Sequence, residues 1–197
     1  MSTRTPQLKS HQAVRTLTIT ALLFAMAIAL SLFEGLLPPI PSPVPLKYGL
    51  SNIAIMYALF FLGPKSAFTI AVLKSTFIIM TRGLFAGLVS IGGGLLSVLV
   101  MYLLYKLSKA RLSYLLISVA GAIFHNAGQL FVAMVILNMP LAFGYIVPLM
   151  ALTGVGTGIL SAVLLKLIIP ALAAIPGHKE WMTFASEKKA QMDDELP

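Results

Sequence analysis

The sequence of 197 residues contains no cysteine and few charged residues. Without cysteine there is no disulfide framework, no thiolate nucleophile and no thiolate ligand for a metal or an iron–sulfur cluster. Charged residues make up 10 % of the chain, against roughly 25 % in a soluble domain. Hydrophobic residues make up 58 % and the mean hydropathy is +0.95. These proportions exclude a water-soluble globular protein and predict an integral membrane protein.

Acidic residues are especially scarce in the hydrophobic part of the chain. Within residues 1–177, Glu34 is the single acid beside eleven Lys and Arg residues. The net charge of +8 therefore belongs to a membrane-embedded body rather than to a nucleic-acid-binding face. Carboxylate clusters that could hold magnesium, zinc or a diphosphate are missing. We expect no metal, no cofactor, no enzymatic activity and no nucleic-acid partner.

Six apolar stretches, separated by short breaks, predict an all-α bundle of six transmembrane helices. The predicted spans are Thr16–Phe33, Tyr48–Leu62, Ser66–Met80, Leu84–Tyr105, Leu115–Leu137 and Tyr145–Ile169. The second and third have fifteen residues each, so they reach about 22 Å of a hydrocarbon core of roughly 30 Å. We expect these two helices to lean on neighbours or to line a water-accessible cavity.

Lys and Arg residues concentrate in alternate loops, and cytoplasmic loops carry such an excess. Placing both termini in the cytoplasm leaves only Lys47 and Arg82 in outer loops. The chain then divides into a cytoplasmic segment at 1–15, a six-helix membrane domain at 16–172 and a cytoplasmic polar tail at 173–197. We expect a multi-pass protein of the cell membrane.

The connection between the first two predicted spans is rich in proline. Five of the eight residues in Pro38–Pro45 are proline, which excludes a helix there because proline lacks the backbone N–H donor. We expect a stiff external loop over residues 34–47. It acts either as a spacer or as a lid over an outward-facing pocket.

Three cations fall in the outer half of the predicted bundle. Lys74 lies near the middle of the third span, where a charge is costly unless it is paired or faces a cavity. Arg82 follows about two turns later, and Lys47 precedes the second span, close to Asn52. Either Glu34 pairs with one cation while the others reach lipid phosphates, or these residues line a pocket for a small anionic or strongly polar ligand.

The fifth predicted span carries a stripe of polar and small residues at helical spacing. Its members are Ser118, Gly121, Ala122, His125, Asn126 and Gln129. Such a stripe either joins neighbouring helices by hydrogen bonds or places His125, Asn126 and Gln129 in the same cavity as Lys74. A metal or catalytic role for His125 is not expected, because no second histidine or intramembrane acid completes a site.

The first predicted span carries alanine at every fourth position, at Ala21, Ala25 and Ala29. Small residues in this spacing allow another helix to approach closely. The partner is either a helix of the same bundle or a separate membrane protein.

Three stretches of the chain resemble a known family. They are VPLKYGLSNIAIMYALFFLG at Val44–Gly63, SIGGGLLSVLVM at Ser90–Met101 and SVAGAIFHNAGQL at Ser118–Leu130. They resemble the small membrane proteins called heptaprenyl diphosphate synthase component I, also known as the Gx transporter family, over Thr16 to Leu167. That family is similar to the S components of energy-coupling-factor (ECF) transporters, six-helix proteins with an external loop after the first helix.

The resemblance implies a substrate-binding subunit that takes up a small vitamin-like or precursor-like molecule. The ligand site would lie on the outer side, with His125, Asn126 and Gln129 among its residues, and the alanine ladder would dock an ECF coupling subunit that works with ATPases. Where the family has arginine in the third span, this chain has Lys74, which cannot form a bidentate contact with an anion.

A second hypothesis is a non-catalytic membrane subunit that anchors a prenyl diphosphate synthase or a quinone- or flavin-linked redox assembly. In that case the cytoplasmic loop at Lys106–Arg111 and the tail would bind a soluble enzyme. A self-sufficient secondary carrier is a third hypothesis, which the lack of a clear inverted repeat opposes.

Overall fold

The computed structural model describes residues 6–36, 49–108, 112–138 and 143–173. Within these residues the chain forms six α-helices and no strand, so the predicted all-α class is confirmed. The helices are α1 (Pro6–Leu36), α2 (Asn52–Phe61), α3 (Pro64–Arg82), α4 (Leu84–Leu107), α5 (Tyr114–Leu137) and α6 (Phe143–Ala173). The predicted loop at Pro38–Pro45, Lys47 and the polar tail after residue 173 lie outside the described residues.

Four stretches in the described part of the chain are long and apolar enough to cross a membrane. They are Thr16–Leu36, Leu84–Leu107, Tyr114–Leu137 and Pro148–Ile169. The ten residues of α2 reach only about 15 Å, and α3 carries Lys65, Lys74 and Arg82. The described residues therefore form six helices, and four of these contain a stretch that is long and apolar enough to cross a membrane. The prediction that all six helices are membrane spans is not confirmed.

The long helices expose large apolar side chains. Leu17, Leu103, Phe131 and Leu152 are between 43 % and 71 % exposed on α1, α4, α5 and α6. In water such surfaces would favour association, whereas lipid tails solvate them and leave the backbone hydrogen bonds inside each helix intact. The surface therefore suits a bilayer.

Local sequence signals set several helix boundaries. Gly63 and Gly83 have φ angles of 95° and 90°, a region that glycine reaches without steric cost, and they separate α2 from α3 and α3 from α4. Ser113 accepts a hydrogen bond from the Leu116 N–H at 3.3 Å and caps α5. Near Gly49 the chain makes a turn in which the Asn52 N–H donates to the Gly49 carbonyl.

Most helix boundaries differ from the predicted spans, most clearly in the first two helices. The second helix begins at Asn52 rather than Tyr48, because the turn at Gly49 precedes it. The first helix runs from Pro6 to Leu36 rather than from Thr16 to Phe33, so residues 6–15 of the predicted cytoplasmic segment and residues 34–36 of the predicted external loop are helical. Hydropathy alone does not mark these ends, because the helix and the turn have similarly apolar residues.

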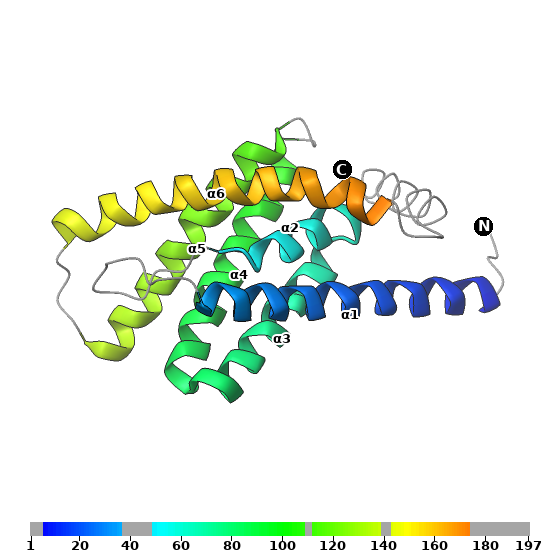
Figure 1. The fold of residues 1–197 in the computed structure, drawn as a ribbon, viewed down its shortest axis with the longest axis horizontal. Helices are drawn as coiled ribbons and strands as arrows, with labels where there is room; N and C mark the ends of the chain where they lie inside the picture. Colours follow the sequence, from blue (N-terminus) through cyan, green and yellow to red (C-terminus); the bar gives the residue numbers. More distant parts are fainter. Residues whose placement is uncertain (1–5, 37–48, 109–111, 139–142, 174–197) are drawn as a thin grey trace.

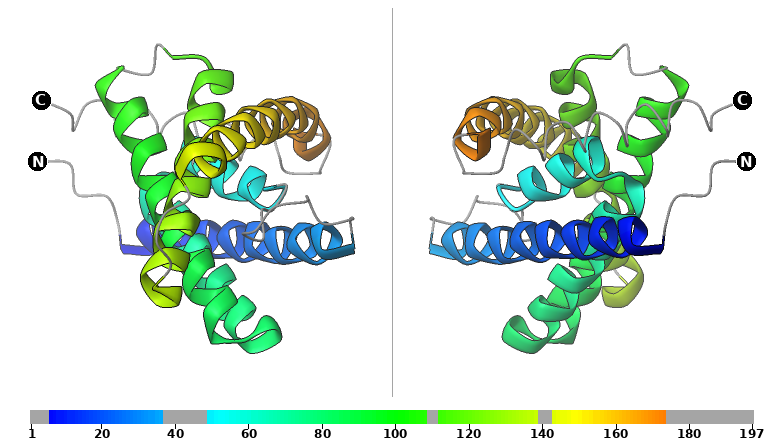
Figure 2. Two further views of the ribbon diagram at one scale, coloured as in Figure 1. Left: turned by 90° about the vertical axis from the view of Figure 1, so that its left-hand side faces the viewer. Right: turned by 90° about the vertical axis from the view of Figure 1, so that its right-hand side faces the viewer.

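The helices form two groups that cross each other. Figures 1 and 2 show α3, α4 and α5 running alongside one another, with α1 and α6 crossing them and α2 between α1 and α6. Neighbouring helices α3, α4, α5 and α6 pack in chain order, and α2 contacts α1, α3, α4 and α6. The short helix is therefore the centre of the described fold.

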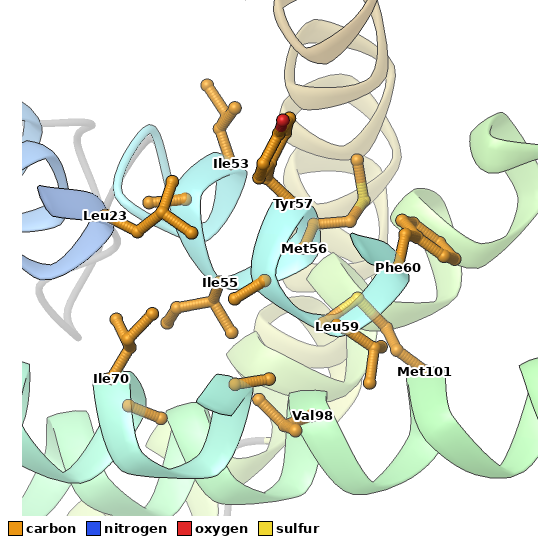
Figure 3. Packing of buried hydrophobic residues seen from close by; sticks show 14 of the residues in the cluster. Leu23, Ile53, Ile55, Met56, Tyr57, Leu59, Phe60, Ile70, Val98 and Met101 are labelled. Carbon is orange, nitrogen blue, oxygen red and sulfur yellow. The ribbon is translucent and has the colours of Figure 1, made fainter. Parts of the chain in front are cut away.

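The hydrophobic core surrounds α2. Every residue from Ile53 to Phe60 is buried, and Figure 3 shows Leu23 of α1, Ile70 of α3 and Met101 of α4 around them. A helix that is apolar on all sides must be enclosed by apolar partners. Because these partners are protein side chains and not lipid, α2 does not need the length of a membrane span. This agrees with the expected reliance of the second helix on its neighbours.

Helices α4 and α5 approach each other at glycines. A Cβ atom added to Gly128 would lie 2.6 Å from the Gly92 carbonyl oxygen and 3.0 Å from the Gly93 Cα. These obstacles are backbone atoms, so a side chain at residue 128 would force the helices apart. By contrast, a Cβ atom at Gly156 of α6 would meet nothing within 4 Å.

We therefore predict that Gly128→Ala destabilises the purified protein by about 1–3 kcal/mol, because it overpacks the α4–α5 contact. The matched control Gly156→Ala leaves stability unchanged or raises it slightly, since alanine favours a helix over glycine. Circular dichroism during heating in detergent measures both. Equal midpoints for the two variants would contradict the observed helix contact.

A buried acid ties α1 to the turn before α2. Glu34 is 6 % exposed, and its Oε1 accepts a hydrogen bond of 2.5 Å from the Gly49 N–H. The contact joins residues that are distant in the sequence and fixes the turn from which α2 starts. A buried backbone N–H without such a partner is costly.

We predict that Glu34→Leu lowers stability by about 1–3 kcal/mol, because it removes the acceptor for the Gly49 N–H. Glu34→Gln is the matched control, since its amide oxygen can still accept this bond, and it should retain most of the stability. The same thermal unfolding measurement compares the two. A Gln variant as unstable as the Leu variant would show that the hydrogen bond is not what this acid contributes.

Candidate functional site

A small polar cavity lies between α2, α4, α5 and α6. Its volume is about 10 Å³, which is room for about one water molecule. It is lined by Gly49, Asn52, Met56, Ser97, Met101, Ser118, Gly121, Ala122, His125, Asn126, Thr157 and Ser161. These residues come from the turn before α2 and from four helices, so the cavity exists only when the bundle is assembled.

The polar stripe of α5 forms one wall of this cavity. All of its members except Gln129 are lining residues, because positions three and four apart share one face of a helix. Its small residues let α4 come close, and a Cβ atom at Gly121 would lie 2.6 Å from the Met101 sulfur and 3.3 Å from the Ser97 hydroxyl. The stripe therefore sets both the helix spacing and the polarity of the wall.

His125 contacts the next turn of α5. Its side chain is 4 % exposed and that of Gln129 is 1 % exposed. The Gln129 Nε2 lies 3.1 Å from the His125 Nε2. The Gln129 Oε1 is buried and has no hydrogen-bond partner among the described residues.

Two other members of the stripe join α5 to α6. The Asn126 Nδ2 donates to the Met150 carbonyl at 3.2 Å and to the Thr153 hydroxyl at 3.4 Å. The Ser118 hydroxyl donates to the Gly158 carbonyl at 2.8 Å. The stripe therefore connects helices, as the first alternative expected, and also lines a cavity, but Gln129 and Lys74 are not among the described lining residues.

The turn before α2 provides the opposite wall. Gly49 has a φ of 74°, which suits glycine, and its N–H bonds to Glu34. Asn52, at the start of α2, lines the cavity. Its Oδ1 is buried without a hydrogen-bond partner in the described part of the chain.

Two of the cations predicted for the site, Lys74 and Arg82, are not among the described lining residues. Lys74 is 5 % exposed, and its Nζ donates to the Ser51 hydroxyl at 2.7 Å. Arg82 is exposed, and its Nη2 donates to the Ser31 carbonyl at 3.0 Å. Lys47 lies outside the described residues. Of the predicted binding residues, the structure brings Asn52, His125 and Asn126 together at the cavity.

Sequence reasoning missed five lining residues on other helices. They are Met56 of α2, Ser97 and Met101 of α4, and Thr157 and Ser161 of α6. Thr157 and Ser161 are one turn apart within an apolar span, which is the same signal that identified the α5 stripe. Met56 and Met101 gave no signal, because methionine is ordinary in a hydrophobic core.

The alanine ladder of α1 faces away from the rest of the described chain. Ala21, Ala25 and Ala29 are exposed, whereas Leu23 and Ala27 on the other side of the helix are buried. These three alanines therefore leave a shallow, smooth surface on the outside of the bundle.

The chemistry of the cavity is that of recognition by hydrogen bonds. Its described lining combines hydroxyls, amides, one imidazole and two thioethers, and includes no Lys, Arg, Asp or Glu. In the part of the chain that the structure describes, no group of three His, Asp or Glu residues is placed to hold a metal ion.

Comparison with known proteins identifies the family. The family model described as heptaprenyl diphosphate synthase component I matches residues 23–179, which include α2 to α5 and every residue of the cavity. No curated protein and no solved structure matches the chain. The match confirms the resemblance seen in the sequence, and the chain belongs to the heptaprenyl diphosphate synthase component I family.

Proposed function

We propose that the protein is a substrate-binding subunit of the cell membrane that takes up a small vitamin-like or precursor-like molecule with the help of energising partners. Both termini lie in the cytoplasm, and the chain performs no catalysis. The observation that carries this proposal is a cavity inside the bundle that is lined by polar side chains, among them Asn52 and His125.

Burying a polar side chain inside a helix bundle costs free energy unless its polar atoms form hydrogen bonds. A buried oxygen without a hydrogen-bond partner costs about 1–3 kcal/mol, and the Asn52 Oδ1 is in that position. An apolar residue at the start of α2 would avoid this penalty. A ligand that donates a hydrogen bond to the oxygen would remove the penalty when it binds.

The cavity must open to admit a ligand. At about 10 Å³ it holds about one water molecule, so the described conformation is a closed one. The turn before α2 is the natural wall to move, because two polar contacts hold it, one from Glu34 to Gly49 and one from Lys74 to Ser51. Lys74 then acts on the wall, and Arg82 holds α1 through the Ser31 carbonyl. Lys47, outside the described residues, stays a proposed ligand contact.

The exposed alanine ladder is proposed as the docking surface for a transmembrane coupling subunit that works with ATPases. Its three alanines are exposed on α1, and small residues permit close helix contact in lipid, where packing drives association. Leucine on this face would suffice for contact with lipid alone.

A second candidate function follows from the family's name. Heptaprenyl diphosphate synthase component I implies a partner in prenyl diphosphate synthesis, and this chain would then be its non-catalytic membrane subunit. In that case the polar residues of the cavity serve helix packing, as Ser118 and Asn126 do.

We predict that the wild-type protein, purified gently from native membranes, retains a coupling protein with ATPases. Ala25→Trp should reduce their recovery by at least about tenfold, because a large side chain prevents close helix contact. Ala151→Trp, at an exposed alanine of α6, is the matched control and should retain them. Mass spectrometry of the eluted proteins measures recovery, and gel filtration checks that both variants fold.

The same measurement separates the two functions. Recovery of a prenyl synthase or of redox enzymes, with no coupling protein, would favour the anchoring role. Equal recovery of the coupling protein with both tryptophan variants would refute the ladder as its docking surface.

A further inference from the structure

We infer that the cavity recognises an uncharged ring compound that donates hydrogen bonds through N–H or O–H groups, and not the anion that the chain's positive charge suggests. This inference rests on the proposed function and specifies the ligand of the same cavity. It depends on which charges and which hydrogen-bonding atoms surround the cavity.

The first observation is the lack of charge in the lining. None of the described lining residues is Lys, Arg, Asp or Glu. Lys74 is buried nearby, but its Nζ is engaged at 2.7 Å by Ser51, which is not a lining residue. Arg82 donates to a backbone carbonyl of α1. A buried anion would lose its hydration without meeting a cation, which is strongly unfavourable.

The second observation concerns the surroundings of His125, the one described lining residue that could become positively charged. Its Nε2 lies 3.1 Å from the Gln129 Nε2. No carboxylate is among the described lining residues to balance a charge on the ring, and a buried charge without a counter-ion is strongly unfavourable. No other titratable side chain lines the described part of the cavity.

The third observation is the kind of polar atom left open. Asn52 lines the cavity, and its Oδ1 is buried and lacks a partner among the described residues. Amide oxygens only accept hydrogen bonds. A ligand that complements them must donate, as the N–H groups of amides, lactams and nucleobases do.

The fourth observation is the apolar part of the lining. Met56 of α2 and Met101 of α4 contribute thioethers, which adapt their shape and make favourable contacts with ring systems. Figure 3 shows both side chains close to the core around α2. Together, two thioethers and an open acceptor oxygen on Asn52 fit a flat uncharged ring with a donor at its edge.

The absence of cysteine allows a direct test that needs no knowledge of the ligand. Ser161→Cys places a single thiol in the cavity, and Ser113→Cys places one at an exposed position as a reference. Both full-length variants, in detergent, react with three methanethiosulfonates of similar size: neutral hydroxyethyl, anionic sulfonatoethyl and cationic trimethylammonioethyl. Each rate at residue 161 is divided by the rate of the same reagent at residue 113.

We expect the normalised rate of the neutral reagent to exceed those of both charged reagents by at least about tenfold, equivalent to about 1.4 kcal/mol. An anionic or cationic reagent that is as fast as the neutral one would overturn the inference. Reaction of the reference thiol alone would mean that the cavity does not admit solutes, which would refute the proposed function itself. Ser97→Cys, also in the lining, replaces Ser161→Cys if that variant fails gel filtration.

The donor requirement has its own control. In Ser161→Cys, the neutral hydroxyethyl reagent is compared with the ethyl reagent, which lacks a donor. The ratio of their rates should fall about threefold or more when Asn52→Leu is added, because the open acceptor is lost. An unchanged ratio would show that the Asn52 oxygen does not select for hydrogen-bond donors.

Discussion

The enclosure of α2 is the constraint on which the other features of the fold depend. Ten residues cannot span a bilayer, and eight consecutive buried residues show that this helix meets protein on every side. The neighbouring helices must therefore surround it, as α1, α3, α4 and α6 do. Because α2 is short, it leaves space at its first turn between α4, α5 and α6. The polar cavity occupies that space.

The interior polar groups divide into two kinds. Ser118 and Asn126 complete hydrogen bonds with α6, and they contribute to helix association in the ordinary way. Asn52 and Gln129 keep a buried acceptor oxygen without a partner among the described residues. An account based on packing alone explains the first kind but leaves the energetic cost of the second unexplained. Under the proposed function, a ligand that donates a hydrogen bond to Asn52, which lines the cavity, removes this cost there.

Part of this arrangement could be predicted from the sequence, because it depends on local periodicity. The apolar runs gave six helices, and the spacing of Ser118, Gly121, Ala122, His125 and Asn126 gave one wall of the cavity, since residues on one helix face are fixed by the helical period. Both the short length of the second helix and its reliance on neighbours also followed from residue counts. The family resemblance was visible in the same stretches.

The remaining features depend on contacts between distant segments. Lys74 appeared to be a ligand contact because a charge within an apolar span is rare, but Ser51 receives its hydrogen bond. The local sequence does not reveal that the hydroxyl of Ser51, in the turn before α2, lies 2.7 Å from the Lys74 Nζ. Likewise, the sequence left open whether the alanine ladder packs inside the bundle or faces outward. The answer depends on how α1 is rotated about its own axis. The weak separation of polar and apolar faces along α1 does not fix that rotation.

Helix α1 relates the proposed partner surface to the wall of the cavity. Ala25 lies on its exposed face, whereas Glu34, further along the same helix, is buried and holds the Gly49 N–H. Gly49 itself lines the cavity. An α-helix transmits displacement along its axis because its hydrogen bonds are internal. Under the proposed function, a partner that shifts α1 therefore also acts on the turn that closes the cavity, without contacting the ligand. Glu34, the single acid among residues 1–177, lies near the end of α1 on the side opposite the exposed alanines. At this position its carboxylate accepts the hydrogen bond that fixes the turn at Gly49.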